Sequence, residues 1–323
     1  MTRLLAFLLP AVLVMPVATF AQGAKPARIG WLSAGTAEVD ASLLVGLRRG
    51  LKGLGHAEGK TYRLEERYTA GRPDKLPEAA AELVRAKVDV IMASGDQAAL
   101  AAKKATSSIP IVVQVADAIG IGLVANLARP GGNVTGVSDL HADLVPKRLE
   151  ILKELVPALS RAAFLSNPSN PTCVRQAKEI AAAAPTFGLA VHPVAVAGAA
   201  ELEQAFALMA KEKHGGLIVC GDRMLSTHRA SIYALATRAR IPAMYANRRF
   251  VDSGGLMSYG TNLTDMYQRL AMHIDRILKG ARPGDLPLEQ PTTFEIAINL
   301  KAAKAIGLVV PRSLLLRAEH IVE

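Results

Sequence analysis

The first half of the sequence alternates short runs of β-branched and other apolar residues with Ala-rich stretches whose apolar positions follow a helical spacing. The runs that predict strands are residues 28–32, 62–68, 88–92 and 111–115. The stretches that predict helices are residues 40–54, 77–86 and 97–107. These strands are mostly apolar, which is typical of a parallel sheet covered by helices on both faces.

The same alternation restarts after the turn-rich residues 129–133. Here the predicted helices are residues 144–155, 174–183, 200–210 and 228–238. The predicted strands are residues 162–165, 190–196, 216–220 and 243–245. Two successive sets of strand–helix units predict an α/β protein with two doubly wound parallel-sheet lobes, not one barrel.

Three segments are predicted to cross between the lobes, near residues 134–139, 254–260 and 294–300. A helix over residues 267–278 is expected to return to the first lobe. The first lobe then comprises residues 28–138 and 261–293, and the second comprises residues 139–254 and 300–323. Three crossings between two lobes predict a hinge.

Residues 1–21 have the three parts of a secretory signal peptide: a positive start, an uncharged apolar run and small residues before a cleavage point at Ala21. Pro10 and Pro16 interrupt the run and disfavour a membrane anchor, and no Cys stands at the cleavage point for lipid attachment. We therefore predict a soluble periplasmic protein that begins near Gln22. No later run approaches the roughly 20 apolar residues of a spanning helix.

The formal net charge is +10, but the basic residues are scattered over predicted helix faces and form no long run. Together with the export signal, this argues against nucleic acid as a partner. Cys173 and Cys220 are the two cysteines. In an exported protein they could form one disulfide, or Cys220 could be a buried free thiol at the end of its strand.

Polar residues follow several of the predicted strands, where ligands bind in open parallel sheets. Free N–H groups at the helix N-termini there favour a carboxylate, and acidic side chains favour an ammonium or hydroxyl group. The candidate ligand-binding residues are Thr36, Ser94, Gly95, Asp96, Asp117, Asn167, Asp222 and Tyr245. Each could instead cap a helix or shape a turn, and capping and binding can coexist.

Catalytic patterns are missing from the sequence: it has no nucleophile elbow, no phosphate loop and no paired-His metal spacing. Gly120-Ile121-Gly122 is too short for a dinucleotide fingerprint and is interpreted as a flexible turn. We therefore expect a binding protein that has no catalytic residues, cofactor or metal.

Five segments give the chain a resemblance to a known family: VIMASG at 90–95, LARPGGNVTG at 127–136, GGLMSYG at 254–260, EQPTTFE at 289–295 and NLKAA at 299–303. Together they resemble the ABC transporter substrate-binding family that includes tryptophan/tyrosine-uptake binding proteins. The resemblance covers nearly all of the mature chain. It implies a type I periplasmic-binding fold with a ligand cleft between two lobes.

On this basis we expect a monomeric solute-binding protein that captures an amino acid or small carboxylate and delivers it to an ABC permease in the inner membrane. One alternative is a cofactor-independent racemase that uses Cys173 and Cys220 as opposed thiols. However, both cysteines fall in the second predicted lobe. Another alternative is a sensor module that presents its ligand-bound form to a receptor.

Overall fold

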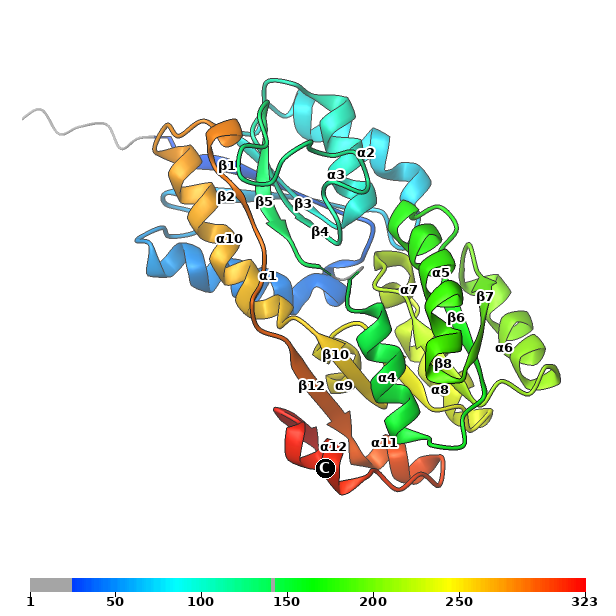
Figure 1. The fold of residues 1–323 in the computed structure, drawn as a ribbon. Coiled ribbons are helices and arrows are strands. Elements are labelled where there is room, and N and C mark those ends of the chain that lie inside the picture. Colours follow the sequence, from blue (N-terminus) through cyan, green and yellow to red (C-terminus); the bar gives the residue numbers. More distant parts are fainter. Residues whose placement is uncertain (1–24, 141–142) are drawn as a thin grey trace, which may run out of the picture.

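The computed structural model describes residues 25–140 and 143–323 and consists of two α/β lobes (Figure 1). The predicted signal peptide, residues 1–21, lies outside the described residues. The fold class predicted from the sequence is confirmed, because each lobe is built on its own sheet with strands and helices in alternation. None of the helices within these two ranges is long and apolar enough to cross a membrane.

The first lobe contains a six-stranded sheet in the order β11-β5-β4-β3-β1-β2, in which every neighbouring pair is parallel. Its strands are β1 (Ala27–Ser33), β2 (Tyr62–Tyr68), β3 (Val90–Ser94), β4 (Ile111–Val115), β5 (Val134–Ser138) and β11 (Leu288–Glu289). Its helices are α1 (Ala37–Gly53), α2 (Leu76–Arg85), α3 (Asp96–Ala105) and α10 (Leu263–Leu278). Strands β3 and β4 are buried along their whole length, as expected of central strands between two helical layers.

The second lobe contains a seven-stranded sheet in the order β13-β12-β10-β9-β8-β6-β7. Its strands are β6 (Arg161–Ser166), β7 (Ala190–Ala195), β8 (Gly216–Val219), β9 (Ala243–Tyr245), β10 (Met257–Gly260), β12 (Glu295–Asn299) and β13 (His320–Val322). Its helices are α4 (Val145–Leu155), α5 (Pro171–Ala183), α6 (Leu202–Lys211), α7 (Arg223–Thr227), α8 (Arg229–Arg238), α9 (Arg248–Asp252), α11 (Leu300–Ala305) and α12 (Arg312–Arg317). Strand β12 runs antiparallel to β10, so this sheet is mixed at one side.

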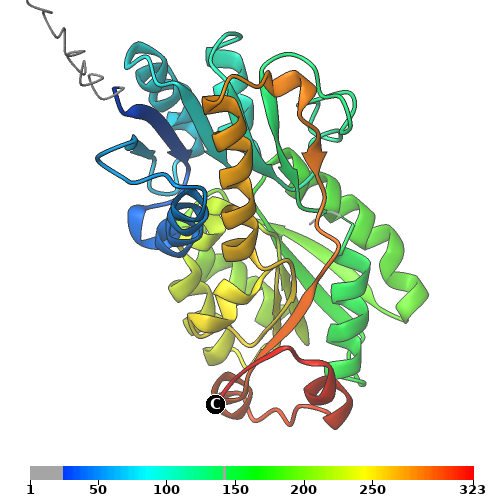
Figure 2. The same cartoon turned by 90° about the vertical axis from the view of Figure 1, so that its left-hand side faces the viewer.

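Most residues of each segment that was predicted to cross between the lobes belong to a strand of one sheet. Strand β5 pairs with β4 in the first lobe, while β10 and β12 pair with each other in the second. The chain therefore passes between the lobes beside these strands: after β5, between β10 and α10, and between β11 and β12 (Figures 1 and 2). The hinge itself stays a prediction.

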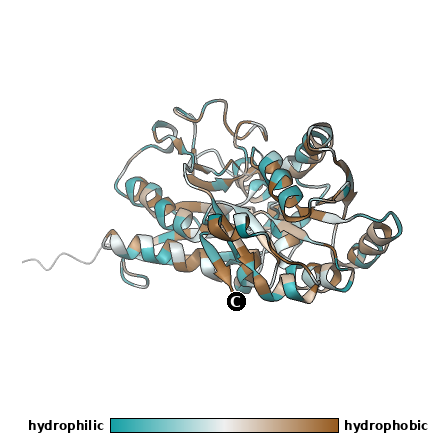
Figure 3. Ribbon diagram, turned by 60° about the horizontal axis from the view of Figure 1, so that its bottom comes forward, coloured by the Kyte–Doolittle hydropathy of each residue, from teal (hydrophilic) through white to brown (hydrophobic). Residues whose placement is uncertain are grey.

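Hydrophobic residues fill the space between the sheets and the helices. Along each helix in Figure 3, hydrophobic and hydrophilic residues alternate. In the first lobe, α1 packs directly on α10, the helix that returns from the second lobe (Figure 2). Gly46 and Gly50 make this approach possible. A Cβ atom at Gly46 would collide with the carbonyl oxygen of Thr264, and one at Gly50 would lie 2.6 Å from the Cβ of Ala271.

Candidate ligand-binding site

A polar pocket lies between the two lobes, where the carboxyl ends of both sets of central strands face each other. Its volume is about 40 Å³. The pocket is lined by Ala34, Ser94, Gly95, Asp96, Gln97, Ala98, Gln114, Ala116, Asp139, Asn170, Gly221, Asp222, Arg223, Asn247 and Leu263. Four of the predicted residues are therefore brought together there: Ser94, Gly95, Asp96 and Asp222.

The wall formed by the first lobe is the turn between β3 and α3. Gly95 has a φ of +97°, and a Cβ atom there would lie 3.2 Å from the Cγ of Arg223, so both conformation and space favour glycine. The Ser94 hydroxyl lies 2.6 Å from the hydroxyl of Tyr267. Asp96 accepts a hydrogen bond from the Ala116 N–H at 2.8 Å, and its burial raises the pKa of the carboxyl group. This wall therefore presents a buried carboxyl group at the first turn of α3.

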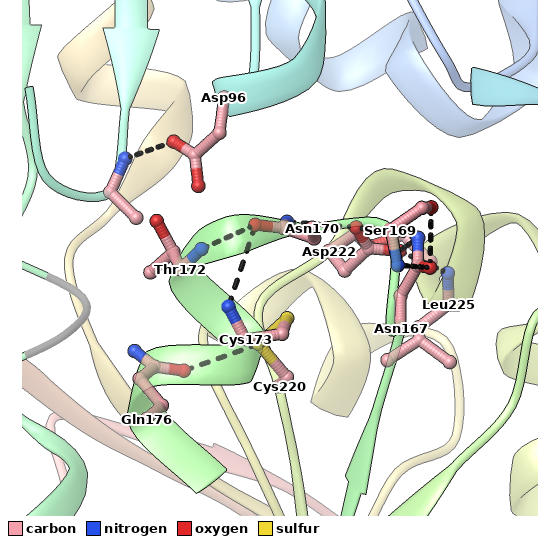
Figure 4. The surroundings of a disulfide bond; sticks show 12 residues. Asp96, Asn167, Ser169, Asn170, Thr172, Cys173, Gln176, Cys220, Asp222 and Leu225 are labelled. Atoms are coloured by element: carbon pink, nitrogen blue, oxygen red, sulfur yellow. Dashed lines mark hydrogen bonds between the residues drawn. A yellow bond between two sulfur atoms is a disulfide. The ribbon is translucent and has the colours of Figure 1, made fainter. Parts of the chain in front are cut away.

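The wall formed by the second lobe is organised around Asp222, which caps the N-terminus of α7 (Figure 4). Its carboxylate accepts a hydrogen bond from the Leu225 N–H at 3.0 Å. It also accepts hydrogen bonds from the side-chain amides of Asn167, at 3.2 Å, and Asn170, at 2.9 Å. Asn170 in turn caps α5 through the Thr172 N–H. Asp222 thus both caps a helix and lines the pocket, and the sequence analysis had allowed for both roles in one residue.

Arg223 reaches from the second lobe into the first and is only 8% exposed. Its guanidinium donates a hydrogen bond to the Gln114 side-chain oxygen at 2.7 Å and another to the Tyr267 hydroxyl at 3.2 Å. It also lies 4.0 Å from the buried carboxylate of Asp40. Burial alone would lower the pKa of Arg223, but interactions with Tyr267, Asp40 and Asp139 raise it overall. The side chain is therefore a fixed cation at the pocket.

The sequence patterns did not lead us to three residues that meet at the pocket, Arg223, Gln114 and Tyr267. Gln114 carried a signal, because it is the polar residue within the otherwise apolar strand β4. Arg223 directly follows the predicted Asp222, but nothing in the pattern indicated that it would cross the cleft. Tyr267 carried no such signal either, since it occupies an ordinary helical position in α10.

Other contacts between the lobes lie around the pocket. The Gln97 amide donates a hydrogen bond to the Ser169 hydroxyl at 3.1 Å. Arg249 donates to the Ser42 hydroxyl at 2.8 Å and also to the Val39 carbonyl oxygen. The two lobes are thus in a closed arrangement, with their polar surfaces in direct contact.

Four predicted residues do not line this pocket. Thr36 caps α1 through the Val39 N–H at 3.2 Å, and Asn167 lies behind Asp222. Asp117 forms an ion pair with Arg175 across the lobes and accepts a hydrogen bond from the Gly120 N–H at 2.9 Å. Tyr245 is buried in the core of the second lobe, where its ring stacks on Phe250 at 5.1 Å and meets Tyr233 edge-on. These rings cover Tyr245 at the end of its strand, so its side chain does not reach the pocket in this closed arrangement.

Cys173 and Cys220 form a disulfide that joins the first turn of α5 to the end of β8 (Figure 4). Their Cα atoms are 5.9 Å apart, and both residues are buried in the second lobe. The bond lies directly behind the pocket wall, since Cys220 precedes the Gly221–Asp222 turn. The racemase alternative requires two free thiols, and both sulfurs are bonded to each other in this structure.

Two doubly wound lobes with a polar pocket between them define the class of two-lobed solute-binding proteins. The sequence matches the family described as ABC transporter substrate binding protein over residues 38–322. The chain therefore belongs to that family, as its motifs indicated.

Individual relatives agree with this assignment. The chain is 26% identical to the tyrosine-binding protein of Clostridioides difficile (strain R20291), over 81% of this chain and 76% of that protein. A conserved domain protein from Vibrio cholerae has a similar structure, with a TM-score of 0.86 and 27% identity over 92% of this chain and all of that one. The ABC domain from Streptococcus pneumoniae, solved in complex with L-Trp, gives a TM-score of 0.85 and 26% identity with the same coverage.

Proposed function

We propose that this protein captures an amino acid or small carboxylate between its lobes, as the periplasmic component of an ABC importer. The observation that carries the proposal is that one pocket between the lobes is lined by charged groups of both signs. Arg223 supplies a cation, and the carboxyl groups of Asp96 and Asp222 lie on the two walls. A small zwitterion would complement both signs of charge at once.

The N-terminus of α3 adds to this complementarity. Its first-turn N–H groups favour an anionic group, and a guanidinium can hold a carboxylate by two parallel hydrogen bonds. The apolar side chains of the lining are three alanines and one leucine, namely Ala34, Ala98, Ala116 and Leu263, and no aromatic side chain lines the pocket within the described part of the chain. This lining favours a compact, polar ligand.

Ligand entry requires a change of shape. The closed pocket of about 40 Å³ is far below the roughly 300–1,000 Å³ of typical small-molecule sites. Because Arg223 spans the pocket, the lobes must separate or this side chain must turn before a ligand can enter. The three chain passages between the lobes are the places where such a rotation would be absorbed.

The test is a thermal-shift screen of the mature protein, followed by calorimetric titration of each hit. The panel contains amino acids, including tyrosine and tryptophan, small carboxylates, and amines that lack a carboxylate. A ligand that binds only the folded state must raise the melting temperature. Loss of a hydrogen bond to a charged group in Arg223→Ala should weaken binding by about 1.5–3 kcal/mol, or roughly ten- to a hundredfold.

Arg238→Ala is the matched control, because Arg238 pairs with Glu203 on the exposed surface of the second lobe. It should bind ligand like the unmodified protein. Absence of any hit, or full affinity in Arg223→Ala, would count against the proposed site.

The proposed location and partner need separate tests. A disulfide is typical of proteins from oxidising compartments, which supports export. Mass spectrometry of periplasmic protein should find an N-terminus near Gln22. Uptake of labelled ligand should depend on this protein and an ABC permease; binding without dependent uptake would favour the sensor alternative.

A further inference from the structure

Two histidines and a glutamate meet on the second lobe, outside the ligand pocket. His192 lies on β7, the edge strand of the sheet, while Glu212 and His214 lie in the turn between α6 and β8. His192 Nδ1 is 2.9 Å from His214 Nε2, and Glu212 Oε2 is 3.7 Å from the same nitrogen. One potential metal-ligand atom from each residue falls within 4.8 Å of the others.

We propose that His192, Glu212 and His214 form a binding site for one divalent transition-metal ion of the Zn²⁺ class. Two imidazoles and a carboxylate form a ligand set that Zn²⁺ accepts, with water in the fourth position. This proposal is independent of the ligand pocket and of the transport role.

The local structure already holds His214 in a ligating orientation. Its Nδ1 lies 3.3 Å from the Met209 carbonyl oxygen. A carbonyl oxygen can only accept, so this contact favours the tautomer with the proton on Nδ1 and the lone pair on Nε2, the atom nearest the other two residues. The backbone supports this position, because the His214 N–H donates to the same carbonyl at 3.0 Å. Lys213 adopts a left-handed φ of +55° to make that turn.

The spacing of the potential ligand atoms also suits a metal ion. Ligand nitrogens bonded at about 2.0–2.1 Å in a tetrahedral site lie about 3.3 Å apart, so the rings need to separate by only a few tenths of an ångström. When the metal binds, the proton on His192 Nδ1 would pass to Nε2 of the same ring by exchange with solvent, so that both imidazoles stay neutral. Glu212, with 41% of its side chain exposed, leaves a path for entry from solvent.

Calorimetric titration of the mature, tag-free protein with ZnCl₂ tests the site. We expect one saturable Zn²⁺ per molecule and a rise in melting temperature on binding. Changing even an outer partner of a metal ligand costs about 10–100-fold in affinity, so His192→Ala should weaken Zn²⁺ binding at least as much. Glu212→Gln should also weaken it.

His320→Ala is the matched control, because His320 Nε2 lies 2.8 Å from Asp252 Oδ1 and so offers one imidazole and one carboxylate without a second imidazole. It should keep the full affinity for Zn²⁺. If His192→Ala fails to fold without metal, the partly exposed Glu212→Gln carries the test, and Co²⁺ absorption then reports the ligand set. Absence of saturable binding, or equal affinity in the folded site variants, would show an ordinary imidazole hydrogen bond and overturn the proposal.

Discussion

At the scale of single residues, the pocket contains a buried carboxyl group, that of Asp96, whose ionisation works against the stability of the fold. Asp96 is 4% exposed at the first turn of α3. Burial raises the pKa of its carboxyl group, and the nearby Asp222 and Asp117 add to that rise, despite the hydrogen bond from Ala116. A buried carboxylate that is costly in the free protein is suited to an ammonium ligand that would relieve the cost.

This arrangement predicts a pH dependence for Asp96→Asn. The folded-state pKa lies above the ordinary value of 3.8, so the folded protein holds its proton more tightly than the unfolded chain. The contribution of Asp96 to stability is therefore fully present below pH 3.8 and is lost as pH rises through the folded-state pKa. Urea denaturation should show Asp96→Asn gaining stability over the unmodified protein as pH rises toward 7. A difference independent of pH would contradict this.

Asp222→Ala is expected to affect folding as well as binding, since the carboxylate accepts three hydrogen bonds from its own lobe. We expect a loss of about 1–3 kcal/mol in the free energy of unfolding, from the lost cap and the unpaired amides. Asn262→Ala is the comparison, because Asn262 caps α10 through one hydrogen bond and should cost only about 1 kcal/mol. Unchanged stability in Asp222→Ala would indicate that Asp222 serves the ligand alone.

At the scale of elements, close contact between α1 and α10 attaches the returning helix to the first lobe. Gly50→Ala should destabilise the protein by about 1–3 kcal/mol, because the added methyl group meets Ala271 and the backbone of α10. Gly53→Ala in the same helix meets nothing within 4 Å. It should be neutral or stabilise by up to about 1 kcal/mol through helix propensity. Thermal or urea unfolding of the pair measures the difference, and equal stabilities would argue against the close packing.

The disulfide links two elements that also carry the pocket wall. Cys173 and Cys220 are 47 residues apart, so the chain-entropy relation predicts that reduction lowers the free energy of unfolding by about 4 kcal/mol. Denaturation with and without dithiothreitol measures this loss. The Cys173→Ser, Cys220→Ser double variant is the control and should not respond to reductant. If dithiothreitol did not change the free energy of unfolding of the unmodified protein either, the two cysteines would not be bonded in solution.

At the scale of the whole molecule, the contacts of Arg223, Arg249 and Gln97 hold the lobes in a closed arrangement. A ligand that touches both lobes favours that state by its differential contacts. Because ligand entry requires separated lobes, we expect the ligand-free protein to populate an open state as well. Small-angle scattering should then show a smaller radius of gyration at saturating ligand.

The same measurement tests the contact outside the pocket. Arg249→Ala removes hydrogen bonds to Ser42 and Val39, so it should enlarge the ligand-free radius of gyration. Arg238→Ala, which affects a pair within one lobe, should leave it unchanged. Identical radii for all three proteins, with and without ligand, would contradict hinge closure.

The two-lobed α/β class could be predicted from the sequence alone, because burial on both faces of a parallel sheet leaves an apolar run in each central strand. Most helices and strands were recognised from local periodicity, but several boundaries were not. The strand predicted at 88–92 is β3 at Val90–Ser94, since Lys87 adopts a φ of +52° and pairing with β1 begins at Val90. Helix α5 begins at Pro171, before its predicted start, because Asn170 caps it.

For the candidate site, the sequence could predict that strand ends carry the polar residues, because the carboxyl ends of parallel strands lie at one edge. It could not predict which of them face the pocket. Arg223 meets Gln114 and Tyr267, which lie 109 and 44 positions away in the chain. Such contacts depend on how the two lobes dock and on which side-chain rotamers their packing allows. Neither can be predicted from a local sequence pattern. Only the tertiary structure places Arg223 at the pocket, buries Tyr245 in the core of the second lobe and joins Cys173 to Cys220.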